Sequence, residues 1–217
     1  MSRALCHQCQ RPKNACICAF AININNNIPV IVLQHPNEVS QSKGTVSLLT
    51  QSLKQCEVIV GENFDDSTTL LQRLKQYEGN IALLYPSEHA TTLEYSSQAQ
   101  QKLMQDYDTD FNTEITSEKA NNHDIQCIII LDGTWKKAYR MFMLNACLHK
   151  IKHIVLPTGI ASLYQIRKTK KENALSSLEA CCHALACLEN NPKKYQALLN
   201  SFVKFNQFQQ SFNRNIL

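Results

Sequence analysis

The chain has 217 residues, of which 44% are hydrophobic and 18% are charged, and its formal net charge at pH 7 is +4. This length and apolar content predict one domain of ordinary size with a real core, and no apolar stretch approaches the ~20 residues that a membrane span requires. The first residues lack the long apolar segment of a signal peptide, so we expect a cytoplasmic protein whose cysteines are thiols or metal ligands.

Four cysteines lie close together near the N-terminus: Cys6, Cys9, Cys16 and Cys18. A Cys-x2-Cys pair lets two thiolates reach one ion from a tight turn, and tetrahedral Zn²⁺ takes four such donors. The second pair is closer than the usual spacing, which keeps an Fe–S cluster and a redox dithiol as alternatives to structural zinc. The sequence therefore predicts a cysteine-rich zinc element over residues 1–25, followed by a larger domain over 26–217. The remaining six cysteines lie on apolar segments and are interpreted as packing residues.

Strand and helix signals alternate after the first ~25 residues, which is typical of an α/β fold with a mostly parallel sheet and helices on both faces. The expected strands are residues 28–34, 56–60, 81–85, 126–131 and 153–156. The expected helices are 43–54, 68–77, 135–144 and 175–188, with a last helix starting at Pro192. The apolar stripe of that last helix is expected to pack in the core.

Three of the expected strands run into proline, at His35-Pro36, Tyr85-Pro86 and Leu156-Pro157. Proline cannot donate to the ladder of hydrogen bonds, so each strand should stop there. Because ligands of open α/β sheets bind outside the carboxyl ends of the strands, these three ends and Asp132 are expected to frame one rim.

The segment from Cys127 to Trp135 carries the strongest local signal. An apolar run ends at Asp132, then Gly133 and Thr134 precede helix-forming residues, which predicts a buried strand, a tight turn and a helix capped by Thr134. Asp132 is then either placed at a ligand site or a plain turn residue. Trp135, the single tryptophan, either walls a ligand site or packs in the core.

Residues 87–124 are polar, and we interpret them as an insertion with one helix near 95–104 and a loop after it. Charge also divides the chain. Residues 1–120 hold 9 Lys and Arg against 13 Asp and Glu, whereas residues 121–217 hold 13 against 5. The basic half is therefore expected to attract a polyanion through phosphate contacts, although single lysine clusters are commonly solvated helix faces.

Several motifs occur in a characteristic order along nearly the whole chain. They are the four cysteines with Arg11-Pro12, His35-Pro36-Asn37-Glu38, Lys43-Gly44-Thr45, Leu84-Tyr85-Pro86, Asp132-Gly133-Thr134-Trp135, Ser162, Tyr164, Arg167 and Leu175-Ser176-Ser177-Leu178-Glu179-Ala180. In this order they resemble the DTW-domain family, whose members are tRNA-uridine aminocarboxypropyltransferases. Lys43-Gly44-Thr45 replaces the family's frequent Ser-Asn-Thr-Gly, and Ser177 stands where threonine is usual.

The resemblance implies an α/β domain related to the SPOUT methyltransferases, with a C-terminal trefoil knot. It implies S-adenosylmethionine as donor of the 3-amino-3-carboxypropyl group and N3 of a uridine in tRNA as acceptor. Neither a membrane nor an obligate protein partner is expected.

Within that chemistry Asp132 is the first candidate for the base that deprotonates N3, and binding of the donor's ammonium group is its competing role. Glu38 and Glu179 are candidates for either task. Thr134 is expected mainly to cap its helix. The remaining expected binding residues are Trp135 beside a base, Tyr164 as a stacking residue, Arg167 as a clamp for a phosphate or carboxylate, and Leu156 and Pro157 as a wall of the donor pocket.

Two other functions stay open at this point. One is an S-adenosylmethionine-dependent RNA methyltransferase on the same fold. The other is a non-catalytic zinc-bearing protein that binds RNA.

Overall fold

The computed structural model describes residues 4–95, 124–160, 162–163 and 175–212. Six strands of this part of the chain form one parallel sheet in the order β2-β1-β5-β3-β6-β4. They are β1 Val30–Gln34, β2 Cys56–Val60, β3 Ile81–Leu84, β4 Thr91–Thr92, β5 Cys127–Asp132 and β6 Lys152–Val155. Five of these were predicted within two residues at each end, so the parallel α/β sheet is confirmed.

Helices flank this sheet and shorter turns precede it. The bounds are η1 Lys13–Ala15, η2 Cys18–Phe20, α1 Pro36–Val39, α2 Val46–Ser52, α3 Thr68–Gln76, α5 Trp135–Leu144, α6 Ala146–His149, α7 Ser177–Leu188 and α8 Gln196–Ser211. None of the described helices is both long and apolar enough to span a bilayer.

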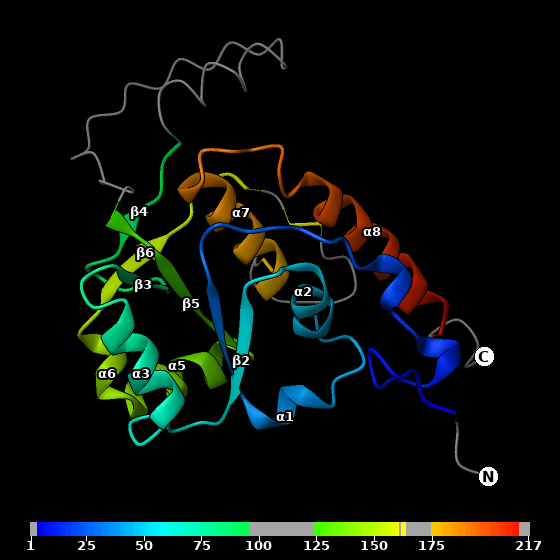
Figure 1. Cartoon of the computed structure of the whole chain (residues 1–217), viewed down its shortest axis with the longest axis horizontal. Helices are drawn as coiled ribbons and strands as arrows, with labels where there is room; N and C mark the ends of the chain where they lie inside the picture. Colours follow the sequence, from blue (N-terminus) through cyan, green and yellow to red (C-terminus); the bar gives the residue numbers. More distant parts are fainter. Residues whose placement is uncertain (1–3, 96–123, 161, 164–174, 213–217) are drawn as a thin grey trace.

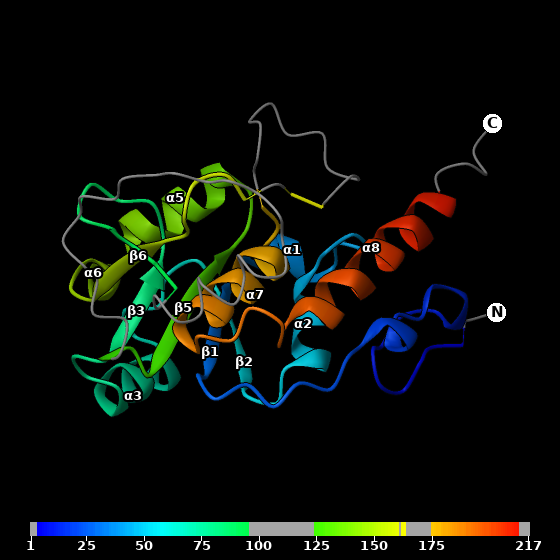
Figure 2. The same ribbon diagram turned by 90° about the horizontal axis from the view of Figure 1, so that it is seen from above.

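The central strands β1, β3 and β5 are buried on both faces of the sheet, because their side chains alternate between two cores. In β1, Val30 and Val32 belong to a core that also contains residues of α2, α7 and α8. Ile31 and Leu33 point the other way, into a core shared with α3, α5 and α6. Helices therefore cover both faces, as predicted, and Figures 1 and 2 show the two groups on opposite sides of the sheet.

The two C-terminal helices begin later than the sequence predicts. Helix α7 starts at Ser177 rather than Leu175, because Ser176 is the N-cap and forms a capping box with Glu179. Helix α8 starts at Gln196 rather than Pro192. There Asn191 accepts a hydrogen bond from the backbone N–H of Lys194 through its own side chain, which holds Pro192 in a turn.

The polar segment 87–124 contributes an edge strand that was not predicted. Thr91 and Thr92 pair in parallel with β6, and Leu93 behind them is buried. Two residues are too few to show an alternating pattern. The helix expected near 95–104 lies, apart from Tyr95, outside the described residues.

The N-terminal cysteine segment packs directly on the larger part of the chain. Ile17 is fully buried in the core shared with α2 and α8. Phe20 of η2 contacts Phe205 and Phe208 of α8, with ring centroids 6.0 and 5.2 Å apart. The apolar stripe of α8 thus packs in the core, as predicted, and Figure 1 shows η2 beside this helix.

Candidate functional site

A cavity of about 540 Å³ opens at the carboxyl ends of β3, β5 and β6. Its volume lies within the range of small-molecule sites. The lining residues are Glu38, Gln41, Lys43, Gly44, Thr45, Leu84, Tyr85, Pro86, Ile130, Leu131, Asp132, Gly133, Thr134, Trp135, Ala138, Ile154, Val155, Leu156, Leu175, Ser176, Ser177 and Ala180. Three of the four expected strand ends thus meet at this cavity. The fourth, after β1, contributes through Glu38 of α1.

Asp132 stands at the end of β5 with both carboxylate oxygens held. The amide Nε2 of Gln34 donates to Oδ2 at 2.9 Å, and the hydroxyl of Ser177 donates to Oδ1 at 2.6 Å. Gln34 and Asp132 are direct register partners at the ends of β1 and β5, which explains their contact. Asp132 is only 8% exposed, so the two donors fix its orientation while it lines the cavity.

The turn after Asp132 brings α5 close to the strand end. A Cβ atom at Gly133 would lie 3.0 Å from Cβ of Lys137, so a larger residue would push the helix away. Thr134 caps α5, since its hydroxyl oxygen accepts from the backbone N–H of Lys137 at 3.4 Å, and this prediction is confirmed. Trp135 is 48% exposed at the cavity, which excludes the core-packing alternative.

An ion pair forms part of the cavity wall. The ammonium group of Lys137 donates to Oε1 of Glu38 at 2.8 Å, and these side chains are 27% and 11% exposed. The charge of the Glu38 carboxylate is therefore balanced by Lys137 before any ligand binds, and this ion pair connects α1 to α5.

His35, the N-cap residue of α1, connects several segments near the cavity through its hydrogen bonds. Its Nδ1 accepts from the backbone N–H of Asn37, so the proton lies on Nε2, which donates to Glu62 at 2.5 Å. The second oxygen of Glu62 faces Arg140 of α5 at 3.3 Å. The backbone N–H of His35 also donates to the carbonyl of Asp132 at 3.0 Å, which ties α1 to the catalytic candidate.

An aromatic side chain, that of Tyr85 after β3, also lines the cavity. Tyr85 stacks on Phe142 with ring centroids 4.5 Å apart, and burial together with nearby Tyr139 raises the pKa of Tyr85. Leu156 lines the cavity beside it, and Pro157 follows Leu156 without being among the lining residues.

Glu179 is fully buried and is not among the cavity-lining residues. Its carboxylate accepts from the backbone N–H of Ser176 at 2.8 Å, from the backbone N–H of Leu163 at 2.5 Å and from the hydroxyl of Ser162 at 3.1 Å. These bonds hold residues 162–163 against the start of α7. Tyr164 and Arg167 lie outside the described residues.

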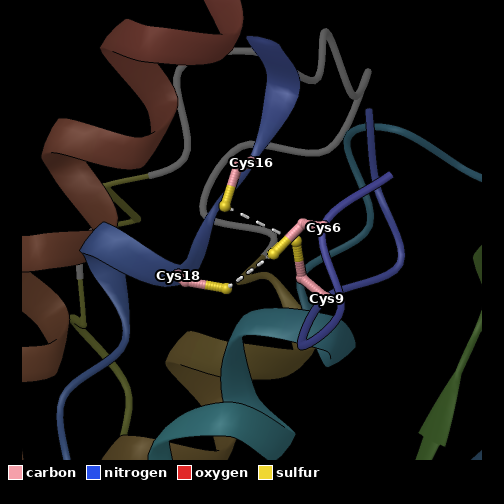
Figure 3. Close-up of side chains that lie close together, drawn as sticks. All are labelled: Cys6, Cys9, Cys16 and Cys18. Carbon is pink, nitrogen blue, oxygen red and sulfur yellow. Dashed lines mark hydrogen bonds between the residues drawn. The ribbon is translucent and has the colours of Figure 1, made fainter. Parts of the chain in front are cut away.

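The four N-terminal cysteines form a separate cluster that could bind a metal ion. All four Sγ atoms lie within 4.8 Å of one another, and Figure 3 shows them pointing toward a common centre. The Sγ atoms of Cys6 and Cys18 are 3.7 Å apart, and those of Cys9 and Cys16 are 3.8 Å apart. Four sulfurs around tetrahedral zinc, each ~2.3 Å from the ion, would be separated by roughly 3.8 Å. Backbone N–H groups of Cys9 and Gln8 lower the pKa of Cys6 to about 6, whereas burial and the neighbouring thiols raise the pKa of Cys18 to about 12, so without a metal ion the thiolate forms at Cys6 before Cys18.

Arg11 connects this cluster to the cavity. Its guanidinium group donates to the carbonyl of Ser42 at 2.6 Å and to that of Gly44 at 3.5 Å. Gly44 and its neighbours Lys43 and Thr45 line the cavity. The cysteine element therefore supports one wall of the site.

Sequence reasoning missed several residues that shape this site. Gln34 and Ser177 were not proposed to orient Asp132, and the loop of residues 41–45 was not assigned to the cavity. One available signal was that Gln34, like Asp132, is a polar residue ending an apolar strand. The contact with Ser177 depends on how α7 packs, for which the sequence carries no local sign.

The amino-acid sequence is similar to those of known proteins. Residues 3–210 match the DTW domain. A protein of Macaca fascicularis named tRNA-uridine aminocarboxypropyltransferase 2 is 30% identical over 212 residues, covering 95% of this chain and 64% of the relative. Proteins of the same name from Mus musculus and Drosophila melanogaster are 29% and 27% identical, covering 95% and 91% of this chain.

This chain spans 64% of the length of the two mammalian relatives and 71% of the length of the fly relative. No solved structure gives a significant match.

Proposed function

The chain belongs to the DTW-domain family, and we propose that it transfers the 3-amino-3-carboxypropyl group of S-adenosylmethionine to N3 of a uridine in tRNA. The observation that carries this proposal is the position of Asp132, held by Gln34 and Ser177 in a cavity large enough for the donor. The names of the three relatives support the same reaction.

The cavity lining suits the parts of the donor. Apolar side chains such as Leu84, Leu156 and Ala180 offer surface to the adenine ring. Glu38, which pairs with Lys137, offers a carboxylate to the donor's ammonium group, and Lys43 provides a cation for the donor's carboxylate. The donor binds with its aminocarboxypropyl arm extended toward the acceptor base.

The reaction needs a group that removes a proton. N3 of uridine attacks well only after its proton leaves. The new bond joins N3 to the terminal carbon of the arm, the bond between that carbon and sulfur breaks, and methylthioadenosine departs. Asp132 accepts the N3 proton, and the fixed donors from Gln34 and Ser177 keep its carboxylate aimed at the acceptor.

Other side chains bind and exclude water. Trp135 walls one base at the cavity mouth, where Thr134 and Leu156 complete the lining. Tyr164 stacks on a base, Arg167 clamps a phosphate or the donor carboxylate, and Glu179 with Pro157 supports the wall. The basic half of the chain supplies attraction for tRNA.

The cysteine cluster holds structural Zn²⁺, and the spacing of its sulfur atoms supports this assignment. Residues 1–25 form this zinc element and residues 26–217 form the catalytic domain. That domain is SPOUT-like with a C-terminal trefoil knot, which follows from the DTW-domain family relationship. The protein acts in the cytoplasm, where its cysteines stay reduced as thiols or as zinc ligands.

The test is to incubate the purified protein with unmodified tRNA and S-adenosylmethionine and to analyse the nucleosides by mass spectrometry. The aminocarboxypropyl adduct of uridine is expected. A methyl adduct instead would identify a methyltransferase, and bound but unchanged tRNA would identify a non-catalytic RNA-binding protein.

A further inference from the structure

Helix α5 exposes a row of large apolar side chains on its outer face. Trp135, Tyr139 and Met143 follow one another at four-residue steps, which places them on one side of the helix. They are 48%, 58% and 53% exposed. The buried residues of α5, Ala138 and Met141, already satisfy its packing on the sheet. An outer face of a core-packed helix is ordinarily polar, so this row requires another explanation.

Two cations lie beside this row. Lys136 is exposed, and Arg140 has a side chain that is 67% exposed with one nitrogen 3.3 Å from Glu62. Alternation of aromatic and basic side chains is typical of surfaces that bind single-stranded nucleic acid. The rings stack on bases and the cations contact phosphates. A face that docks another protein usually has fewer charges at its centre.

The row is continuous with the cavity. Trp135 belongs to both, since it lines the cavity and starts the row. Tyr139 lies close enough to Tyr85, a cavity-wall residue, to raise the pKa of its phenol together with burial. From Trp135 to Met143 the helix advances ~12 Å, enough for a short stretch of nucleotides. A polymer entering the cavity would therefore cross this face.

We propose that the α5 ridge, meaning Trp135, Tyr139 and Met143 with Lys136 and Arg140, binds the unpaired nucleotides that flank the target uridine in its tRNA loop. The inference rests on the proposed function, because it takes tRNA as the substrate. Tyr139 stacks on a neighbouring base and Met143 extends the platform. Lys136 and Arg140 contact the phosphates of the nucleotides that stack on this platform. Paired bases cannot stack on such a platform, so the ridge selects single-stranded segments.

The first test compares tRNA affinity and donor affinity in the same variants. Tyr139→Ala and Met143→Ala are expected to raise the Kd for an unmodified tRNA transcript by about 10-fold and about 3-fold, the range for a lost stacking or apolar contact. The Kd for S-adenosylmethionine should stay unchanged, since the donor pocket is intact. Tyr139→Phe should retain tRNA affinity, because stacking needs the ring and not the hydroxyl.

Leu71→Ala is the matched control. Leu71 is 43% exposed on α3, which covers the same face of the sheet but does not line the cavity. The Kd of this variant for tRNA should equal that of the parent protein. Its comparison with Tyr139→Ala separates the ridge from a general effect of losing exposed apolar area.

The second test measures the cations through salt dependence. Lys136→Gln should reduce the slope of log affinity against log salt by about 0.7–0.9, the amount for one phosphate contact. Lys54→Gln, an exposed lysine after α2, should leave that slope unchanged.

Unchanged tRNA affinity in Tyr139→Ala would overturn the proposal that the α5 ridge binds tRNA. If Tyr139→Ala instead abolished self-association and left tRNA affinity intact, the face would be an interface between copies of the chain, which also overturns it. Failure of the proposed function looks different: the parent protein would bind tRNA through the ridge and form no aminocarboxypropyl uridine. A parent protein with no affinity for tRNA would end both inferences.

Discussion

The hydroxyl of Ser177 donates a hydrogen bond to Oδ1 of Asp132 at 2.6 Å, across 45 positions of sequence. This bond joins the first turn of α7 to the tip of β5. Gln34 holds the other oxygen of Asp132 from the neighbouring strand. The carboxylate is therefore oriented before substrate arrives, and a catalytic group that is already oriented avoids the cost of reorganisation during the reaction.

Replacing Asp132 by Asn tests its role. We expect turnover to fall by about 10²–10⁴-fold, the range for a lost proton-transfer group, while tRNA affinity is retained. The Kd for S-adenosylmethionine, measured by calorimetry, should change far less than turnover. A loss that appeared chiefly in donor affinity would reassign Asp132 to binding the ammonium group, and near-normal turnover would remove it from the mechanism.

Ser177 is expected to act through Asp132 rather than on substrate. Ser177→Ala should lower turnover by about 10-fold, because one oxygen of Asp132 loses its donor and the carboxylate can rotate. Ser177→Thr, which keeps a hydroxyl, should restore most of the activity. If the alanine and threonine variants were equally impaired, a packing role for Ser177 would be the better explanation.

Glu179 is expected to contribute mainly to stability. Glu179→Gln places an amide NH₂ group against the backbone N–H donors of Ser176 and Leu163, and one pairing must be lost in a fully buried site. The free energy of unfolding in urea should fall by about 2–4 kcal/mol. Glu78→Gln, an exposed substitution after α3, serves as the control. A stable Glu179→Gln protein with greatly reduced turnover would argue instead for a direct catalytic role.

Arg11 is expected to link the cysteine element to donor binding. Arg11→Ala removes the hydrogen bonds to the carbonyls of Ser42 and Gly44, so the loop that lines the cavity loses its support. The Kd for S-adenosylmethionine should rise by about 3- to 10-fold, as one or two hydrogen bonds to a charged group are lost. Metal content should be unaffected. Unchanged donor affinity would show that the loop keeps its conformation without Arg11.

Metal analysis tests the cysteine cluster directly. The purified protein should contain one zinc ion per chain, and Cys9→Ser should lose it because a tetrahedral site needs all four sulfurs. Chelation should lower the thermal unfolding midpoint, since Ile17 and Phe20 beside the cluster belong to or pack on the core. Cys56→Ser, outside the cluster, should retain the metal. A folded protein without metal would contradict the assignment.

Local sequence patterns were sufficient to predict much of the secondary structure and part of the candidate site. The apolar run of β5 with Asp132, Gly133 and Thr134 after it predicted a strand, a turn and a capped helix, because each depends on neighbours in sequence. The prolines that follow three strands likewise predicted where those strands end, because proline acts on its immediate neighbours in the chain. The spacing of the first four cysteines likewise predicted a common site, since a few residues of chain can bring their sulfur atoms together.

Other features required the tertiary structure, because they depend on contacts between distant segments. The sequence did not indicate that Ser177 and Gln34 hold Asp132, or that Arg11 reaches the loop at Gly44. It placed Glu179 among the substrate-site candidates, whereas the fold buries that carboxylate among backbone donors outside the cavity lining. Periodicity shows which side chains share a helix face, but only packing decides which face meets the core. The exposure of Trp135 and Tyr139 on α5 was settled by that packing.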